Sequence, residues 1–143
     1  MIYIDSNVLL RYFTAAREPH IALLKRQASV LFESVENGEL EITFSEVLLH
    51  EVASVLTSKK LYGVSRSDAA DYLRTVVSLS NVRLPRGEQR LFLRAIELFS
   101  MHSNVSMADA LMVARAERQQ IQLATFDRAL DSLPYAESWQ FED

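Results

Sequence analysis

The sequence predicts an α/β fold with a short, mostly parallel central sheet of four to five strands. Short runs rich in β-branched or aromatic residues recur along the chain, and longer segments with helical periodicity separate them. This alternation is typical of crossover units, in which a helix connects two parallel strands. The chain has 143 residues, of which 49% are hydrophobic, so we expect a single domain over residues 1–143 with a sizeable core.

Five runs carry the strand pattern. Four are clear, IYID, LEITFS, NVRL and IQLAT, and ESWQF near the C-terminus is weaker. The expected strands therefore cover residues 2–5, 40–45, 81–84, 121–125 and 137–141. Pro85 and Gly87 mark the loop after the third run, and Pro134 precedes the fifth, because these residue types interrupt regular structure.

Helical periodicity fills the intervals between these runs. The expected helices cover residues 6–13, 21–36, 46–60, 66–79, 87–101 and 106–119. Gly38 follows the second helix at a position suited to the glycine that ends many helices. No linker, repeat or low-complexity tract interrupts the pattern.

Composition excludes several classes of protein. There are 19 acidic and 15 basic residues, so the formal net charge of −4 does not attract polyanions, and any nucleic acid must bind a local patch. The absence of cysteine removes disulfides and thiolate sites and fits a reducing compartment, so we expect a cytoplasmic protein. The chain has neither a signal-peptide pattern nor a long uncharged apolar run, so we expect no membrane segment.

Asp5 stands at the end of the first predicted strand. Ligands of open parallel sheets bind at the carboxyl ends of strands, which makes Asp5 a candidate site residue. The alternative is an N-cap, because Asp5, Ser6 and Asn7 are all good caps for the following helix.

Glu51 lies in the helix predicted over residues 46–60. On a helical wheel it falls at the edge of the apolar stripe, between Val47 and Val55, whereas Glu46 and His50 fall on the solvent side. We therefore expect Glu51 to point inward, where a carboxylate needs a cation, hydrogen bonds or a proton. A structural ion pair or a glutamate at the edge of the core is the alternative.

Two further aspartates have capping alternatives of their own. Ser106 and Asp109 match the S-x-x-D capping box, which places Asp109 in the first turn of a helix that can face the same cleft. Asp127 follows the fourth predicted strand and could cap a short helix. Convergence of these two with Asp5 and Glu51 at one edge of the sheet would form a cluster of hard oxygen ligands.

Such a cluster predicts a divalent cation. Clustered carboxylates repel one another unless a cation lies among them, and oxygen ligands favour Mg²⁺ or Mn²⁺ over zinc. This chemistry suits phosphodiester hydrolysis by an activated water. His20, His50 and His102 lack the spacing of zinc ligands, and the three glycines form no phosphate loop.

The four motifs in order resemble the PIN-domain nucleases, and specifically the VapC-type toxins of toxin–antitoxin pairs. The resemblance spans nearly the whole chain and depends on YIDSNVLLRYF, FSEVLLHEVASVL, MADALMVARAE and LATFDRAL. It implies a three-layer α/β/α fold and a Mg²⁺- or Mn²⁺-dependent endoribonuclease. A cognate antitoxin and a homodimer are the partners that it implies.

By position, the resemblance assigns the acidic cluster to Asp5, Glu51, Asp109 and Asp127. It assigns supporting hydrogen bonds beside the metal to Asn7 and Thr125. The chain departs from the family pattern after Asp127, where it has Arg-Ala-Leu and many relatives have an aromatic residue.

Candidate RNA contacts come from Arg86, Arg90 and Arg94, which repeat every four residues along one helix face. A solvated charged face is the alternative, since Glu97 continues the row. Two other functions remain open: a PIN-like domain that binds RNA or protein without cleaving, and a haloacid-dehalogenase-like phosphatase. The phosphatase motif requires an aspartate where Asn7 stands.

Overall fold

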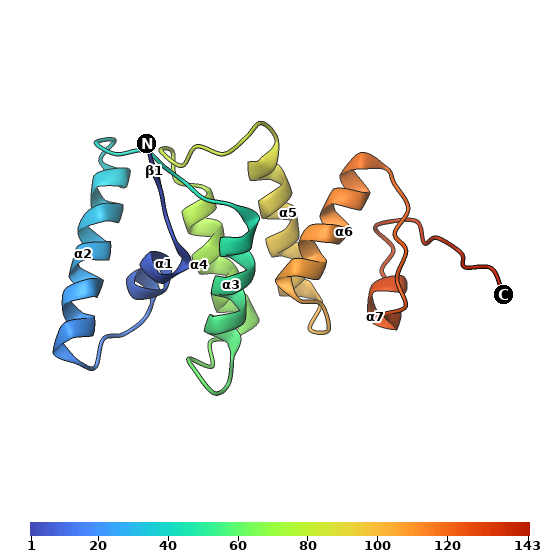
Figure 1. Ribbon diagram of the computed structural model, residues 1–143, viewed down its shortest axis with the longest axis horizontal. Helices are drawn as coiled ribbons and strands as arrows, with labels where there is room; N and C mark the ends of the chain where they lie inside the picture. The colour runs from blue at the N-terminus through green and yellow to red at the C-terminus, as the bar shows by residue number, and fades with distance from the viewer.

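The computed structural model describes residues 1–143 as an α/β fold with seven helices and two short strands (Figure 1). The elements are β1 (Ile2–Tyr3), α1 (Ser6–Phe13), α2 (Pro19–Glu36), β2 (Ile42–Thr43), α3 (Glu46–Thr57), α4 (Arg66–Val77), α5 (Glu88–Met101), α6 (Met107–Gln119) and α7 (Arg128–Asp131). The α/β class and all six predicted helices are confirmed. No helix has the length and apolar character needed to cross a membrane.

Local signals explain where the helices begin and end. The side chain of Ser65 caps α4 by accepting a hydrogen bond from the backbone of Asp68, and α2 begins with Pro19, which needs no hydrogen-bonded N–H in a first turn. Gly38 follows α2 with φ +78°, a left-handed conformation that glycine adopts without steric cost. The prediction of a terminal glycine there is confirmed.

The sheet is much smaller than predicted. β1 and β2 form a two-stranded parallel sheet in which Ile2 pairs with Ile42 and Tyr3 with Thr43. The run at 81–84 contributes only a single bridge from Val82 to Ile42. The runs at 121–125 and 137–141 meet each other through a bridge between Leu123 and Ser138 and do not join β1. The prediction of four to five strands in one sheet is therefore wrong.

Helix packing explains why the sheet stops at two strands. In Figure 1, β1 lies on one side of α3, whereas the segment between α6 and α7 lies beyond α6 at the other end of the molecule. The outer edge of β1 is uncovered, with Ile2 and Tyr3 44% and 67% exposed. A strand-like pattern predicts an extended backbone, but the partner of a strand depends on which helices lie between the candidates.

The core is built mainly from helices. Thirty-one buried residues form one hydrophobic cluster, and α5 packs most extensively against α6 and α4. Arg66, at the start of α4, donates hydrogen bonds to the carbonyl groups of Phe99, His102 and Val105, and its guanidinium lies 3.8 Å from the centre of the Phe99 ring. These contacts anchor the loop between α5 and α6, and so position the first turn of α6, which carries Asp109.

Candidate active site

Asp5 and Glu51 line the same pocket. Asp5 follows β1 and precedes α1, and Glu51 lies in the middle of α3. The pocket has a volume of about 310 Å³. Its other lining residues are Tyr3, Ile4, Ser6, Ser45, Val47 and Leu48. Two carboxylates from distant parts of the sequence therefore line one pocket beside the end of β1.

Hydrogen bonds from the start of α1 orient the Asp5 carboxylate. One oxygen accepts from the backbone N–H of Ser6 at 2.8 Å and from its hydroxyl at 3.3 Å. The second oxygen accepts from the side-chain amide of Asn7 at 3.3 Å. Asp5 is thus the N-cap of α1. Because each oxygen has further lone pairs, capping leaves the carboxylate able to bind a cation.

Glu51 is exposed to solvent, so the prediction that it points inward is wrong. The buried side of α3 consists of Leu48, Leu49, Val52, Ala53 and Leu56. The sequence pattern placed the apolar stripe too far towards Val47, which is 57% exposed. His50 was expected on the solvent side, yet its Nδ1 atom is buried without a hydrogen-bond partner. Exposure makes Glu51 accessible and spares it the cost of burying a charge.

Asp109 and Asp127 serve as helix caps and do not line this pocket. Asp109 and Ser106 form a reciprocal capping box at the start of α6, with hydrogen bonds of 3.1 and 3.4 Å. Asp127 accepts a bond of 2.8 Å from the backbone of Ala129, and its own N–H donates to the hydroxyl of Thr125 at 3.0 Å. The capping alternative for each residue is therefore realised in the structure.

The structure brings two of the four candidate carboxylates together. No group of three or more histidine, cysteine, aspartate or glutamate side chains lies in an arrangement that could hold a metal ion. A pair of carboxylates in an open pocket nevertheless fits Mg²⁺, which usually keeps several waters and binds one or two protein carboxylates. Asp5 and Glu51 provide that pair.

The three candidate RNA-binding arginines are not equivalent. Arg86 and Arg90 are exposed, and neither forms an ion pair. Arg94 donates two hydrogen bonds to Glu117, at 2.9 and 3.0 Å, and a third to Glu97 at 3.0 Å. These bonds, chiefly those to Glu117, raise the pKa of Arg94 above its ordinary value. Arg94 is therefore already neutralised by neighbouring carboxylates.

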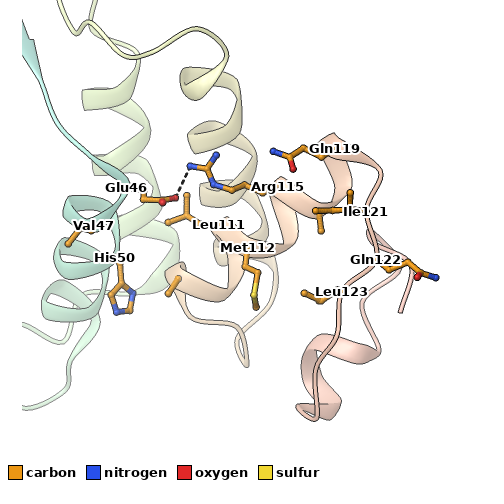
Figure 2. A pocket seen from close by; sticks show the side chains of 12 residues that line it. Glu46, Val47, His50, Leu111, Met112, Arg115, Gln119, Ile121, Gln122 and Leu123 are labelled. Carbon is orange, nitrogen blue, oxygen red and sulfur yellow. Dashed lines mark hydrogen bonds and ion pairs between the residues drawn. The ribbon is translucent and has the colours of Figure 1, made fainter. Parts of the chain in front are cut away.

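A larger apolar pocket, absent from the sequence predictions, adjoins the Asp5–Glu51 pocket through Val47, which lines both. It has a volume of about 500 Å³ and lies between α3, α6 and residues 121–123 (Figure 2). Arg115 of α6 crosses its rim to Glu46 of α3 at 2.9 Å and also binds Glu88 of α5. These glutamates, Glu88 foremost, raise the pKa of Arg115. The arginine thereby ties α3, α5 and α6 together beside the candidate site.

Comparison with known proteins adds one finding to this geometry. The family model described as "PIN domain" matches residues 2–134, which is nearly the whole chain. No curated protein matches the chain. The matched range includes Asp5, Glu51, Asp109 and Asp127.

Proposed function

Because the chain belongs to the PIN-domain family, whose members are generally metal-dependent nucleases, we propose that it is a Mg²⁺- or Mn²⁺-dependent endoribonuclease. We propose further that it is the VapC-type toxin of a toxin–antitoxin pair. PIN domains have a three-layer α/β/α fold, and this chain retains the helices around a sheet of two paired strands. The family assignment leaves the haloacid-dehalogenase-like alternative without support.

The observation that carries the proposal is the shared pocket of Asp5 and Glu51. Two carboxylates on one pocket would repel an RNA phosphate, so a nuclease can use them only with a divalent cation. Their oxygens are hard ligands, and the pocket is open, which leaves room for metal-bound waters and for substrate. A cation held there would lower the pKa of a bound water and offset the charge that develops on the phosphate.

The chain's own residues fix the geometry of this pair. Asn7 and the N-terminus of α1 orient the Asp5 carboxylate, and helix α3 places Glu51 on the same pocket. Such hydrogen-bonding partners tune a metal site because they fix the orientation of its ligands. In the proposed mechanism, Asp5 and Glu51 bind the cation and Asn7 is a positioning residue.

Asp109 and Asp127 do not line the Asp5–Glu51 pocket in this structure, so they are proposed as further acidic ligands that join the site only when the cation binds, with Thr125 supporting Asp127. Support comes from their unused binding capacity, since each cap occupies one carboxylate oxygen and leaves the other without a protein partner. Separate Asp109→Asn and Asp127→Asn variants, titrated with Mn²⁺, test this assignment. An unchanged affinity for Mn²⁺ in either variant would remove that residue from the ligand set.

The proposed partners are an RNA substrate, a cognate antitoxin and a second copy of the chain. A surface suited to protein contact exists on α2, where Leu23, Leu24 and Val30 are 47%, 42% and 61% exposed. Next to it, α1 and α2 enclose a pocket of about 390 Å³ that Leu24 also lines. Co-expression of the chain with the gene beside it would test for an antitoxin.

The second candidate function is a PIN domain that binds without cleaving. The observation in its favour is that Asp5, Asp109 and Asp127 all act as helix caps, which gives each a structural reason to be acidic. Mapping of cleavage sites in total cellular RNA after induction separates the two functions, with Asp5→Asn as the control. New 5′ ends that appear with the wild-type protein and not with Asp5→Asn support the nuclease, and identical RNA in both cultures supports the binding domain.

A further inference from the structure

Five arginines gather where the start of α5 meets the end of α6. They line two adjoining pockets, of about 190 and 310 Å³, which share Leu91 and Arg118. The five are Arg86, Arg90, Arg94, Arg115 and Arg118. This density of positive charge stands out on a chain whose formal net charge is −4.

Ion pairs neutralise two of these arginines and leave three. Arg94 is held by Glu117 and Glu97, and Arg115 is held by Glu88 and Glu46. Both carboxylates that line the two pockets, Glu88 and Glu117, are thereby neutralised in turn. No ion pair involves the remaining three, Arg86, Arg90 and Arg118. The local excess of positive charge therefore comes from these three side chains.

Arg118 is held in place before any ligand binds. Its guanidinium donates a hydrogen bond to the carbonyl oxygen of Gly87, the N-cap of α5. Gly87 has no side chain, and a Cβ atom there would lie only 2.9 Å from the guanidinium carbon of Arg118. A guanidinium has five N–H donors, so this bond leaves the others free to face the pocket.

The start of α5 adds to the attraction for an anion. Gly87 provides no side-chain cap to this 14-residue helix. The N–H of Glu88 donates to the carbonyl of Pro85, which leaves the first-turn N–H groups of Gln89 and Arg90 without an acceptor. Helix N-termini favour anions through these N–H groups and the helix dipole. Glu88, the acidic residue in that turn, forms an ion pair with Arg115, which donates a hydrogen bond to each of its carboxylate oxygens.

We propose that Arg86, Arg90 and Arg118, here called the arginine cradle, bind backbone phosphates of the RNA substrate. The inference rests on the proposed ribonuclease function and identifies where its substrate is held away from the carboxylates. Guanidinium groups form paired hydrogen bonds with phosphate oxygens, and two adjoining pockets can accept more than one phosphate. Arg115 binds Glu88 at the cradle and also Glu46 of α3, the helix that carries Glu51. Figure 2 shows its ion pair with Glu46.

The test is the binding of a fluorescein-labelled single-stranded RNA in EDTA, measured by anisotropy over a series of salt concentrations. The variants are R86A/R90A/R118A and a control, R17A/R26A/K60A, which removes the same charge from exposed residues outside both pockets. We expect the cradle variant to bind on the order of tenfold more weakly. Its salt dependence, as the slope of log K against log salt, should fall by about 0.7 for each phosphate that the protein no longer neutralises.

Two further variants keep the test independent of folding. Removing Arg118 also removes its bond to Gly87, so R86A/R90A is measured separately, because no side-chain hydrogen bond to another residue involves Arg86 or Arg90. The R86A/R90A variant should show about two-thirds of the change in salt-dependence slope that the triple variant shows, because it lacks two of the three arginines. Equal affinity and slope in the cradle variant and the control would overturn the inference.

Two more measurements separate the alternatives. Labelled polyglutamate tests for an acidic protein partner, and a cradle variant whose affinity for polyglutamate falls as strongly as its affinity for RNA would overturn the assignment to RNA.

Cleavage in Mg²⁺ at saturating RNA is measured in parallel, and kcat should be unchanged in the cradle variant while KM rises. Binding that depends on the cradle without any cleavage by the wild type would contradict the proposed nuclease and support the cradle. Cleavage by the wild type, together with unaltered RNA binding by the cradle variant, would support the proposed nuclease and contradict the cradle.

Discussion

Asp5 and Glu51 lie on the same pocket, one at the N-terminus of α1 and the other in the middle of α3. Asp5 is held by three hydrogen bonds from Ser6 and Asn7, whereas Glu51 is exposed and has no hydrogen-bond partner within the protein. The two carboxylates thus differ in their structural roles. Substitutions at each of them can distinguish an effect on protein stability from an effect on RNA cleavage.

Asp5→Asn should abolish most RNA cleavage and leave stability unchanged. Asparagine caps a helix as well as aspartate does, but it lacks the charge that binds a cation. We expect a loss of at least about 100-fold in kcat/KM, the order of effect seen when one electrostatic partner of a transition state is removed. Asp71→Asn, at an exposed site on α4, is the control. Cleavage by Asp5→Asn at the wild-type rate would rule out the proposed mechanism.

Glu51→Gln should have a similar effect on cleavage without changing the melting temperature, because the side chain is exposed and forms no bond that folding depends on. Glu46→Gln on the same helix is the matched control. It weakens the ion pair with Arg115 at the rim of the apolar pocket and should leave activity near the wild-type level. If both substitutions reduced cleavage equally, a general loss of negative charge on α3 would explain the result better than a ligand role for Glu51.

Divalent metal should stabilise the folded protein through the Asp5–Glu51 pair. A ligand that binds only the folded state at a hundred times its Kd stabilises it by about 2.7 kcal/mol, which is measurable as a rise in melting temperature. We expect this rise with Mn²⁺ or Mg²⁺ in the wild type and in Asp71→Asn. The double variant Asp5→Asn with Glu51→Gln should lose it, and an undiminished rise there would place the metal elsewhere.

Asp109→Ala should reduce both stability and cleavage. Loss of the capping box costs about 1 kcal/mol of unfolding free energy. Ser106→Ala removes the same cap without removing a carboxylate, so its stability should fall by a similar amount while cleavage is retained. Melting curves and initial rates on both proteins check this. An equal loss of cleavage in Ser106→Ala would reduce the role of Asp109 to capping, and an unchanged melting temperature in Asp109→Ala would exclude the cap.

Gly87→Ala should destabilise the protein more than Gly63→Ala. Both glycines have positive φ, +84° and +59°, so an added side chain costs about 1–2 kcal/mol at either position. A Cβ at Gly63 meets no atom within 4 Å, whereas one at Gly87 overlaps the guanidinium of Arg118. Chemical denaturation of both variants measures the difference, and Arg118→Ala in the Gly87→Ala background should remove it. Equal destabilisation would show that Arg118 moves aside without cost.

The sequence predicted the helices well because their signals are local. Caps at Asp5, Ser65 and Ser106 and the glycine after α2 lie within a few residues of the ends that they define. The capping alternatives for Asp5, Asp109 and Asp127 were visible for the same reason. The helical wheel failed at the edge of the apolar stripe. Glu51, expected to point inward, is exposed, and His50, expected on the solvent side, has a buried Nδ1 atom. Which flank of an apolar stripe is buried depends on the neighbouring elements.

By itself, the sequence determined the α/β class, the helices and the order of motifs that resembles the PIN domains. Only the tertiary structure decided which distant residues meet. It pairs Asp5 with Glu51, binds Arg94 to Glu117, brings Arg118 beside Arg86, and keeps residues 121–125 away from β1. The physical reason is that helix formation depends on neighbours a few residues apart, whereas strand pairing, ion pairs and shared pockets depend on how whole helices pack.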